Sequence, residues 1–123
     1  MKRFIAALAL AAAFGPAAVA GTAAPLSGDD CILVRDIRNH TVVDQNTMLM
    51  EVFGKGVYRV TTAQACFRSA ISADPIAFNT RGRERICKAS QLGLQARSGY
   101  CGAQSIQRLT AEEVAALPKT LKP

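Results

Sequence analysis

Four cysteines are the residues of this 123-residue chain whose type and spacing most directly suggest chemistry. A cysteine can bind a metal ion, take part in thiol–disulfide exchange, or close a structural disulfide. Successive cysteines are 35, 21 and 14 positions apart, with neither a C-x-x-C motif nor a neighbouring Cys–His pair. Zinc sites and thiol oxidoreductases use such close pairs. The spacing therefore favours two structural disulfides and predicts no metal and no other cofactor. The cysteines are Cys31, Cys66, Cys87 and Cys101.

Three pairings of the four cysteines are possible, and the sequence does not choose among them. We prefer the nested pairing Cys31–Cys101 and Cys66–Cys87. Cys66 precedes a predicted hairpin and Cys87 ends it, while the outer pair would tie the two ends of the fold. Each bond is expected to add about 2–4 kcal/mol of stability.

A hydrolase would need a histidine or a pair of facing carboxylates. His40 is the only histidine, and it adjoins Asn39 in a predicted exposed bend, without a G-x-S-x-G motif. Turn chemistry explains Asp44, and an outer strand face explains Glu51. The sequence therefore assigns no catalytic residue. The carboxylates considered are Asp36, Asp44, Glu51 and Glu84.

Closely spaced arginines form the most distinctive polar feature, because guanidinium groups bind phosphate and carboxylate bidentately. An alternative interpretation is a solvated hairpin tip that Glu84 partly neutralises. Nucleic acid is not an expected partner, since the chain has no Trp and few aromatic residues. The candidate ligand-binding residues are Arg81, Arg83, Arg85 and Arg59, with Arg68 and Lys88 as further basic residues of the same patch.

The first twenty residues have the features of a signal peptide. A basic start at Lys2 and Arg3 precedes an apolar run over residues 4–14, and the small residues of 18–20 form a cleavage site. Cleavage after Ala20 would lower the formal net charge from +6 to +4. The run is too short for a comfortable membrane span, and no later segment is long enough for one. We therefore expect a periplasmic or secreted protein.

The elements that must position these residues are mainly strands. The stretch 36–62 predicts a three-stranded meander, with turns at 44–47 and 54–56. Further strands are expected at 76–78, 85–89, 92–96 and 101–109, and the capping box of Thr110 and Glu113 predicts a helix over 111–117. We expect a small barrel or curved antiparallel sheet of five to six strands. The predicted parts are a flexible mature N-terminus (21–30), one β-rich domain (31–117) and a frayed tail (118–123).

The order of these features resembles a family of small exported proteins of Gram-negative bacteria, defined as a domain of unknown function. The resemblance rests on the signal peptide, the cysteine order and the meander. The matching residues are Cys31-Ile32, Asp36-Ile37, Val42-Val43-Asp44, Tyr58-Arg59, Cys66, Ile86-Cys87, Cys101, Ile106, Leu109-Thr110 and Glu112-Glu113. It implies a compact exported domain with paired cysteines.

The function we expect is that of a non-enzymatic exported module that binds a ligand or serves the envelope, with the arginine loop as its contact surface. Its partner would be an anionic envelope component or an exported protein. The alternatives are a secreted inhibitor of a hydrolase and a small hydrolase.

Overall fold

Antiparallel strands dominate the structure, a computed structural model that describes residues 24–26 and 28–123. The predicted signal peptide over residues 1–20 lies outside the described residues. The strands are β1 (Ala24–Pro25), β2 (Ile32–Leu33), β3 (Ile37–Asp44), β4 (Thr47–Val52), β5 (Gly56–Thr62), β6 (Ala77–Asn79), β7 (Arg85–Ile86), β8 (Gly93–Ala96) and β9 (Gly99–Arg108). The helices are α1 (Ala111–Ala116) and the 3-10 turns η1 (Val34–Asp36), η2 (Ala89–Gln91) and η3 (Lys119–Leu121).

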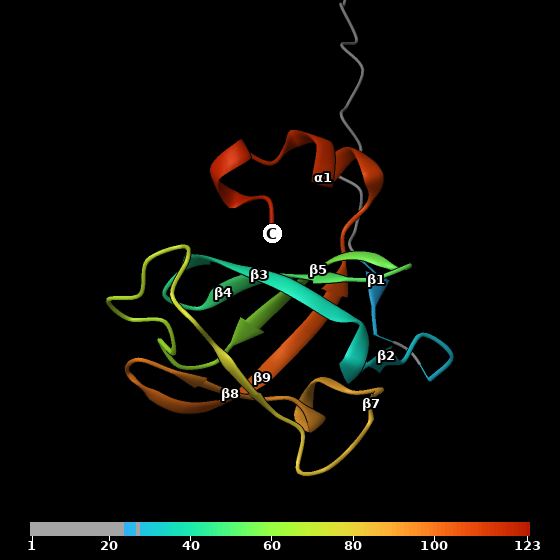
Figure 1. Cartoon of the computed structure of the whole chain (residues 1–123), viewed down its shortest axis with the longest axis horizontal. Coiled ribbons are helices and arrows are strands. Elements are labelled where there is room, and N and C mark those ends of the chain that lie inside the picture. The colour runs from blue at the N-terminus through green and yellow to red at the C-terminus, as the bar shows by residue number, and fades with distance from the viewer. Residues whose placement is uncertain (1–23, 27) are drawn as a thin grey trace, which may run out of the picture.

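One curled sheet in the order β3-β4-β5-β9-β8-β6 forms the body of the fold, and β1 adds to β9. The long strand β9 produces the curl, because its C-terminal half pairs with β5 and its N-terminal half pairs with β8. Figure 1 shows the resulting half-barrel, with α1 on one side and β7 on the other. The prediction of a curved antiparallel sheet of five to six strands with a short C-terminal helix and two disulfides is confirmed.

Strand β4 shows why the sheet has apolar residues on both faces. Met48, Met50 and Val52 belong to the main core, as their alternation predicts. Leu49 points the opposite way and packs in a second cluster with Leu109, and the residues of α1 cover this cluster. Thr110 and Glu113 form the predicted capping box that starts α1. The helix therefore covers the outer face of the meander.

His40 helps to bridge the two edge strands, β3 and β6. Its Nε2 accepts a hydrogen bond from the backbone N–H of Ile76 at 3.2 Å and lies 3.0 Å from the carbonyl oxygen of Asp74. The ring also meets Phe78 of β6 edge-on, with centroids 5.9 Å apart. The bend predicted at Asn39-His40 is wrong, because an irregularity in the β3–β4 register lets the strand continue through both residues.

The two disulfides differ from the preferred pairing. Their Cα–Cα distances are 4.2 and 6.1 Å, and they join Cys31–Cys87 and Cys66–Cys101. The pairing Cys31–Cys101 and Cys66–Cys87 is therefore wrong. The β2–β7 ladder, in which Ile32 lies opposite Ile86, explains the observed pairing. In an antiparallel pair this register also places Cys31 opposite Cys87.

The hairpin expected from residues 76–89 does not form. Strand β6 pairs with β8, whereas β7 leaves the main sheet and pairs with β2 in a separate two-stranded sheet. The arginine-rich segment is therefore a loop that connects two different sheets. This change of partner brings the arginines beside residues 33–35 of the N-terminal part.

Both ends of the described part of the chain contain regular structure. In the stretch 21–30, predicted to be flexible, β1 pairs with the last residues of β9, and the N–H of Leu26 donates to the carbonyl of Ile106 at 3.0 Å. In the predicted frayed tail, η3 lies near β3. The N-terminal segment therefore enters the domain along β9 before it reaches Cys31.

Candidate binding groove

A groove separates η1 from the loop that precedes β7. Its volume is about 420 Å³. Its apolar residues are half-buried, whereas both of its arginines are exposed. We call it the basic groove, and its lining residues are Leu33, Val34, Arg35, Gly82, Arg83 and Glu84.

The two walls of the basic groove are joined by the small β2–β7 sheet. Leu33 lies opposite Arg85 in this ladder, and the N–H of Val34 donates to the carbonyl of Glu84 at 3.0 Å. The Cys31–Cys87 disulfide closes the end of the same ladder. Segments that are distant in sequence therefore meet at a covalently fixed site.

The loop that carries Arg83 has a well-defined turn. Arg81 and Gly82 both have positive φ, 53° and 75°, and the N–H of Arg83 donates to the carbonyl of Thr80 at 3.1 Å, as in a type I′ turn. The side chain of Asn79 accepts from the N–H of Arg81 at 3.0 Å, and the Thr80 hydroxyl donates to the carbonyl of Arg83 at 2.8 Å. These bonds fix the backbone that presents Arg83.

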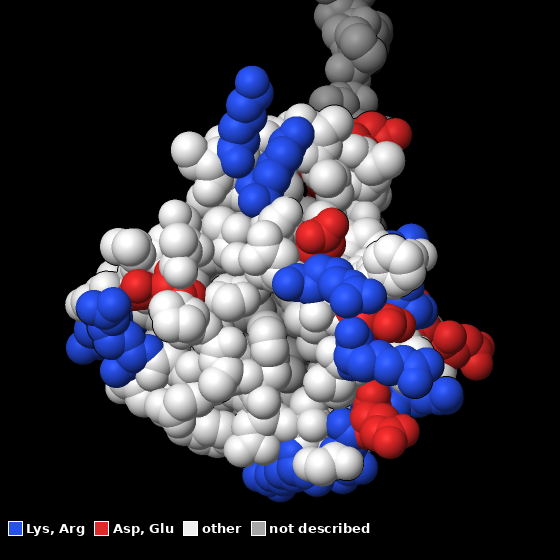
Figure 2. Space-filling model, in the orientation of Figure 1, with Lys and Arg blue, Asp and Glu red and all other residues white. Residues whose placement is uncertain are grey.

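Charged side chains of both signs surround the groove. Figure 2 shows Lys and Arg interleaved with Asp and Glu on the side of the molecule where β2 and β7 lie in Figure 1. Arg35 stands on one wall, and Arg83 and Glu84 stand on the other. Two guanidinium groups beside an apolar floor can hold a carboxylate or phosphate attached to an apolar body.

The structure brings together only part of the predicted arginine set. Arg81, Arg83 and Arg85 lie on or beside one loop, and Arg83 lines the groove. Arg59 is half-buried on β5, opposite Leu49, on the sheet face that α1 covers. It therefore belongs to a different surface. The patch takes its second groove-lining arginine from residue 35 instead, which sequence reasoning missed because the β2–β7 pairing was not foreseen.

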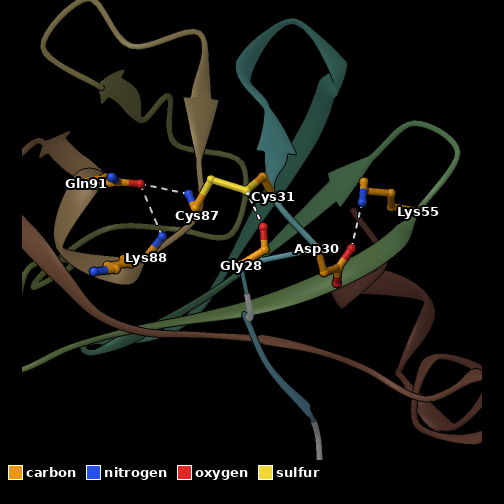
Figure 3. The surroundings of a disulfide bond; sticks show 7 residues. All are labelled: Gly28, Asp30, Cys31, Lys55, Cys87, Lys88 and Gln91. Atoms are coloured by element: carbon orange, nitrogen blue, oxygen red, sulfur yellow. Dashed lines mark hydrogen bonds and ion pairs between the residues drawn. A yellow bond between two sulfur atoms is a disulfide. The ribbon is translucent and has the colours of Figure 1, made fainter.

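A second group of charged residues fixes the segment before Cys31. Figure 3 shows Lys55 reaching Asp30 beside the disulfide, and its Nζ donates to Asp30 Oδ1 at 2.6 Å. Tyr58 Oη donates to Asp30 Oδ2 at 3.1 Å. The hydrogen bond from Lys55 is the main cause that holds the pKa of Asp30 below its ordinary value. The sequence did not reveal this group, because Asp30 and Lys55 both lie in segments that read as loops.

Replacing Asp30 with asparagine is expected to destabilise the protein at neutral pH and to weaken its acid sensitivity. The folded-state pKa of Asp30 is lowered from 3.8, so the stability from its ionised form is present above pH 3.8 and is lost as the pH falls through the lowered value. Urea unfolding from neutral to acidic pH measures this. Asp29→Asn removes the same charge from the neighbouring exposed position and is the matched control. An equal acid dependence in Asp30→Asn and the parent protein would contradict the prediction.

Among the other residues considered for chemistry, one lines the groove. Asp44 Oδ1 accepts from the N–H of Asn46 at 2.8 Å in the β3–β4 turn, as predicted, and Glu51 lies on β4. Of the four candidate carboxylates, Glu84 alone lines the groove. Among residues 24–26 and 28–123, no group of three or more His, Cys, Asp or Glu side chains could hold a metal ion.

Two disulfides indicate that the chain folds in an oxidising compartment outside the cytoplasm. Within the described part of the chain, no helix has the length and apolar character needed to cross a membrane.

Compared with protein-family models, curated proteins and solved structures, the chain matches none.

Proposed function

We propose that this protein is an exported, non-enzymatic binding module that holds an anionic group of its ligand in the basic groove. The observation that carries the proposal is the placement of Arg35 and Arg83, exposed on opposite walls of one groove. Backbone hydrogen bonds and the Cys31–Cys87 disulfide hold these walls before any ligand arrives. A preformed site reduces the ordering that binding requires.

The chemistry of the groove residues favours binding over catalysis. An arginine stays protonated in proteins, so Arg35 and Arg83 can donate hydrogen bonds but cannot act as general bases. Glu84 is exposed, and its backbone carbonyl serves the structure by accepting from Val34. Export is supported by the two disulfides and by the resemblance to small exported proteins. The signal-peptide features of residues 1–20 support cleavage after Ala20.

Replacing Arg83 or Arg35 with glutamine is expected to weaken the binding of an anionic probe about 10-fold. Each substitution removes one charge-assisted hydrogen-bonding group, a loss of roughly 1.5 kcal/mol. Titration calorimetry with poly-L-glutamate, and separately with inorganic polyphosphate, measures the dissociation constant. Low ionic strength suits this measurement, since salt screens such contacts.

Arg59→Gln is the matched control, because it removes an equal charge from a different surface of the protein. If the loss arises in the groove, Arg59→Gln retains the affinity of the parent protein. Equal losses in all three variants would show that net charge alone attracts the probe, and no loss in Arg83→Gln and Arg35→Gln would refute the groove.

A further inference from the structure

The most exposed aromatic side chain of the described residues lies at the end of the β4–β5 hairpin. Phe53 is 65% exposed, although burying a phenylalanine is favourable. The guanidinium carbon of Arg38 lies 5.0 Å from the centroid of its ring. This cation–π contact leaves most of the ring open to solvent.

Backbone contacts through η1 join Phe53 to the basic groove. The N–H of Phe53 donates to the carbonyl of Asp36 at 2.8 Å, at the C-terminal end of η1. At the other end of η1, the N–H of Val34 donates to the carbonyl of Glu84 at 3.0 Å. The 3-10 turn is thus held between the hairpin and the groove loop. We call the surface along it the Phe53 ridge, and its residues are Arg35, Asp36, Arg38, Phe53, Arg83 and Glu84.

The charges of the Phe53 ridge alternate in sign. Asp36 stands between Arg35 and Arg38 in the sequence, and Glu84 directly follows Arg83. Figure 2 shows positive and negative side chains interleaved on the side of the molecule where β2 and β7 lie in Figure 1. A uniformly anionic polymer or membrane surface would also set negative charge against the two carboxylates, which weakens its binding relative to a ligand of mixed charge. A protein segment can instead meet the arginines with acidic side chains and avoid the carboxylates.

We propose that the ligand of the basic groove is a segment of another protein, which places a carboxylate side chain between Arg35 and Arg83 and packs an apolar side chain on Phe53. This inference rests on the proposed function and names its ligand class. Aromatic residues and arginine are enriched at the centres of protein interfaces, where they contribute most of the binding energy. Charge complementarity selects an acidic segment, since the three arginines of the ridge and the adjoining Arg85 exceed its two carboxylates.

Selection of a random peptide library on the full mature protein tests the proposal. We expect the enriched peptides to share an acidic residue near an apolar one. Phe53→Ala is expected to weaken a selected peptide about 30-fold in titration calorimetry, the effect of a hot-spot residue. Tyr100→Ala is the matched control, because it removes another exposed aromatic ring, 52% exposed, from β9. It should bind the peptide as the parent protein does.

Any one of three outcomes would contradict the proposal that the ligand is a protein segment. They are a selection that enriches no peptide, peptides that bind Phe53→Ala as tightly as the parent, and polyphosphate or anionic phospholipid vesicles that bind more tightly than any selected peptide. The substitution removes an exposed side chain, and thermal unfolding of the variant verifies its fold. Failure here is distinct from failure of the groove. If Arg83→Gln weakens the binding of poly-L-glutamate while Phe53→Ala changes no affinity, the groove binds anions and Phe53 has no role in binding.

Discussion

Replacing Cys31 and Cys87 together with alanine is expected to lower the free energy of unfolding by about 4 kcal/mol. The bond joins residues 56 positions apart, so it removes much of the conformational freedom of the unfolded chain. The segments that it joins have little other regular pairing, since β2 and β7 each contain two residues. Urea unfolding of the oxidised variant and parent measures the difference.

The matched control is the variant Cys66→Ala with Cys101→Ala. That bond spans 35 positions, and chain entropy predicts a loss only about 0.4 kcal/mol smaller. The two variants should differ more in their affinity for an anionic probe of the basic groove than in their stability. Loss of the Cys31–Cys87 bond releases one end of the β2–β7 ladder that holds the walls of the basic groove, whereas the other bond joins residues outside that ladder. A stability loss below about 1 kcal/mol in the first variant would show that other contacts hold β2 and β7 together.

Peptide mapping without reduction tests the pairing itself. Every two successive cysteines are separated by Lys or Arg residues, so trypsin places the four cysteines on four different peptides. We expect the peptide of Cys87 to be linked to that of Cys31. A link between the peptides of Cys31 and Cys101 would contradict the fold near β2.

The parts of the fold that the sequence predicted correctly depend on local patterns. Strands β4 and β5 show two-residue alternation beside a glycine-containing turn, with Gly54 and Gly56 at positive φ. The capping box fixed the start of α1 in the same way. Such signals need no knowledge of distant residues, because backbone geometry and neighbouring side chains determine them.

Apart from the bend at Asn39-His40, the errors concern long-range pairing. Strand β7 has two residues and therefore no period, and its partner in the ladder lies 54 positions earlier, Ile32 opposite Ile86. A local hairpin was the natural prediction for such a segment, and the wrong disulfide pairing followed from that hairpin. The same pairing brings Arg35 and Arg83 to the two walls of one groove, so the composition of the groove could not be predicted without it.

Raising the pH from 10 to 12 is expected to lower the free energy of unfolding by about 2 kcal/mol through Tyr58. The side chain is fully buried and donates to Asp30. Burial, and then the Asp30 carboxylate, raise the pKa of Tyr58 to about 12 from its ordinary value of 10.0. The unfolded chain releases the phenol proton near pH 10, whereas the folded chain keeps it. The stability from neutral Tyr58 is therefore complete below pH 10 and is lost towards pH 12. Urea unfolding at stepped pH measures it.

Tyr58→Phe should remove the part of the stability loss between pH 10 and 12 that Tyr58 causes, because phenylalanine has no proton to release. At neutral pH the same variant is expected to lose roughly 1.5–3 kcal/mol, the contribution of a hydrogen bond to a charged acceptor. Tyr100→Phe is the control, since it changes the only other tyrosine, whose side chain is exposed. It should follow the parent protein at every pH. If the free energy of unfolding of Tyr58→Phe falls as steeply as that of the parent between pH 10 and 12, then Asp30 does not meet a buried phenol. The segment that leads to Cys31 and the basic groove would then depend on Lys55, the β1–β9 pairing and the disulfide.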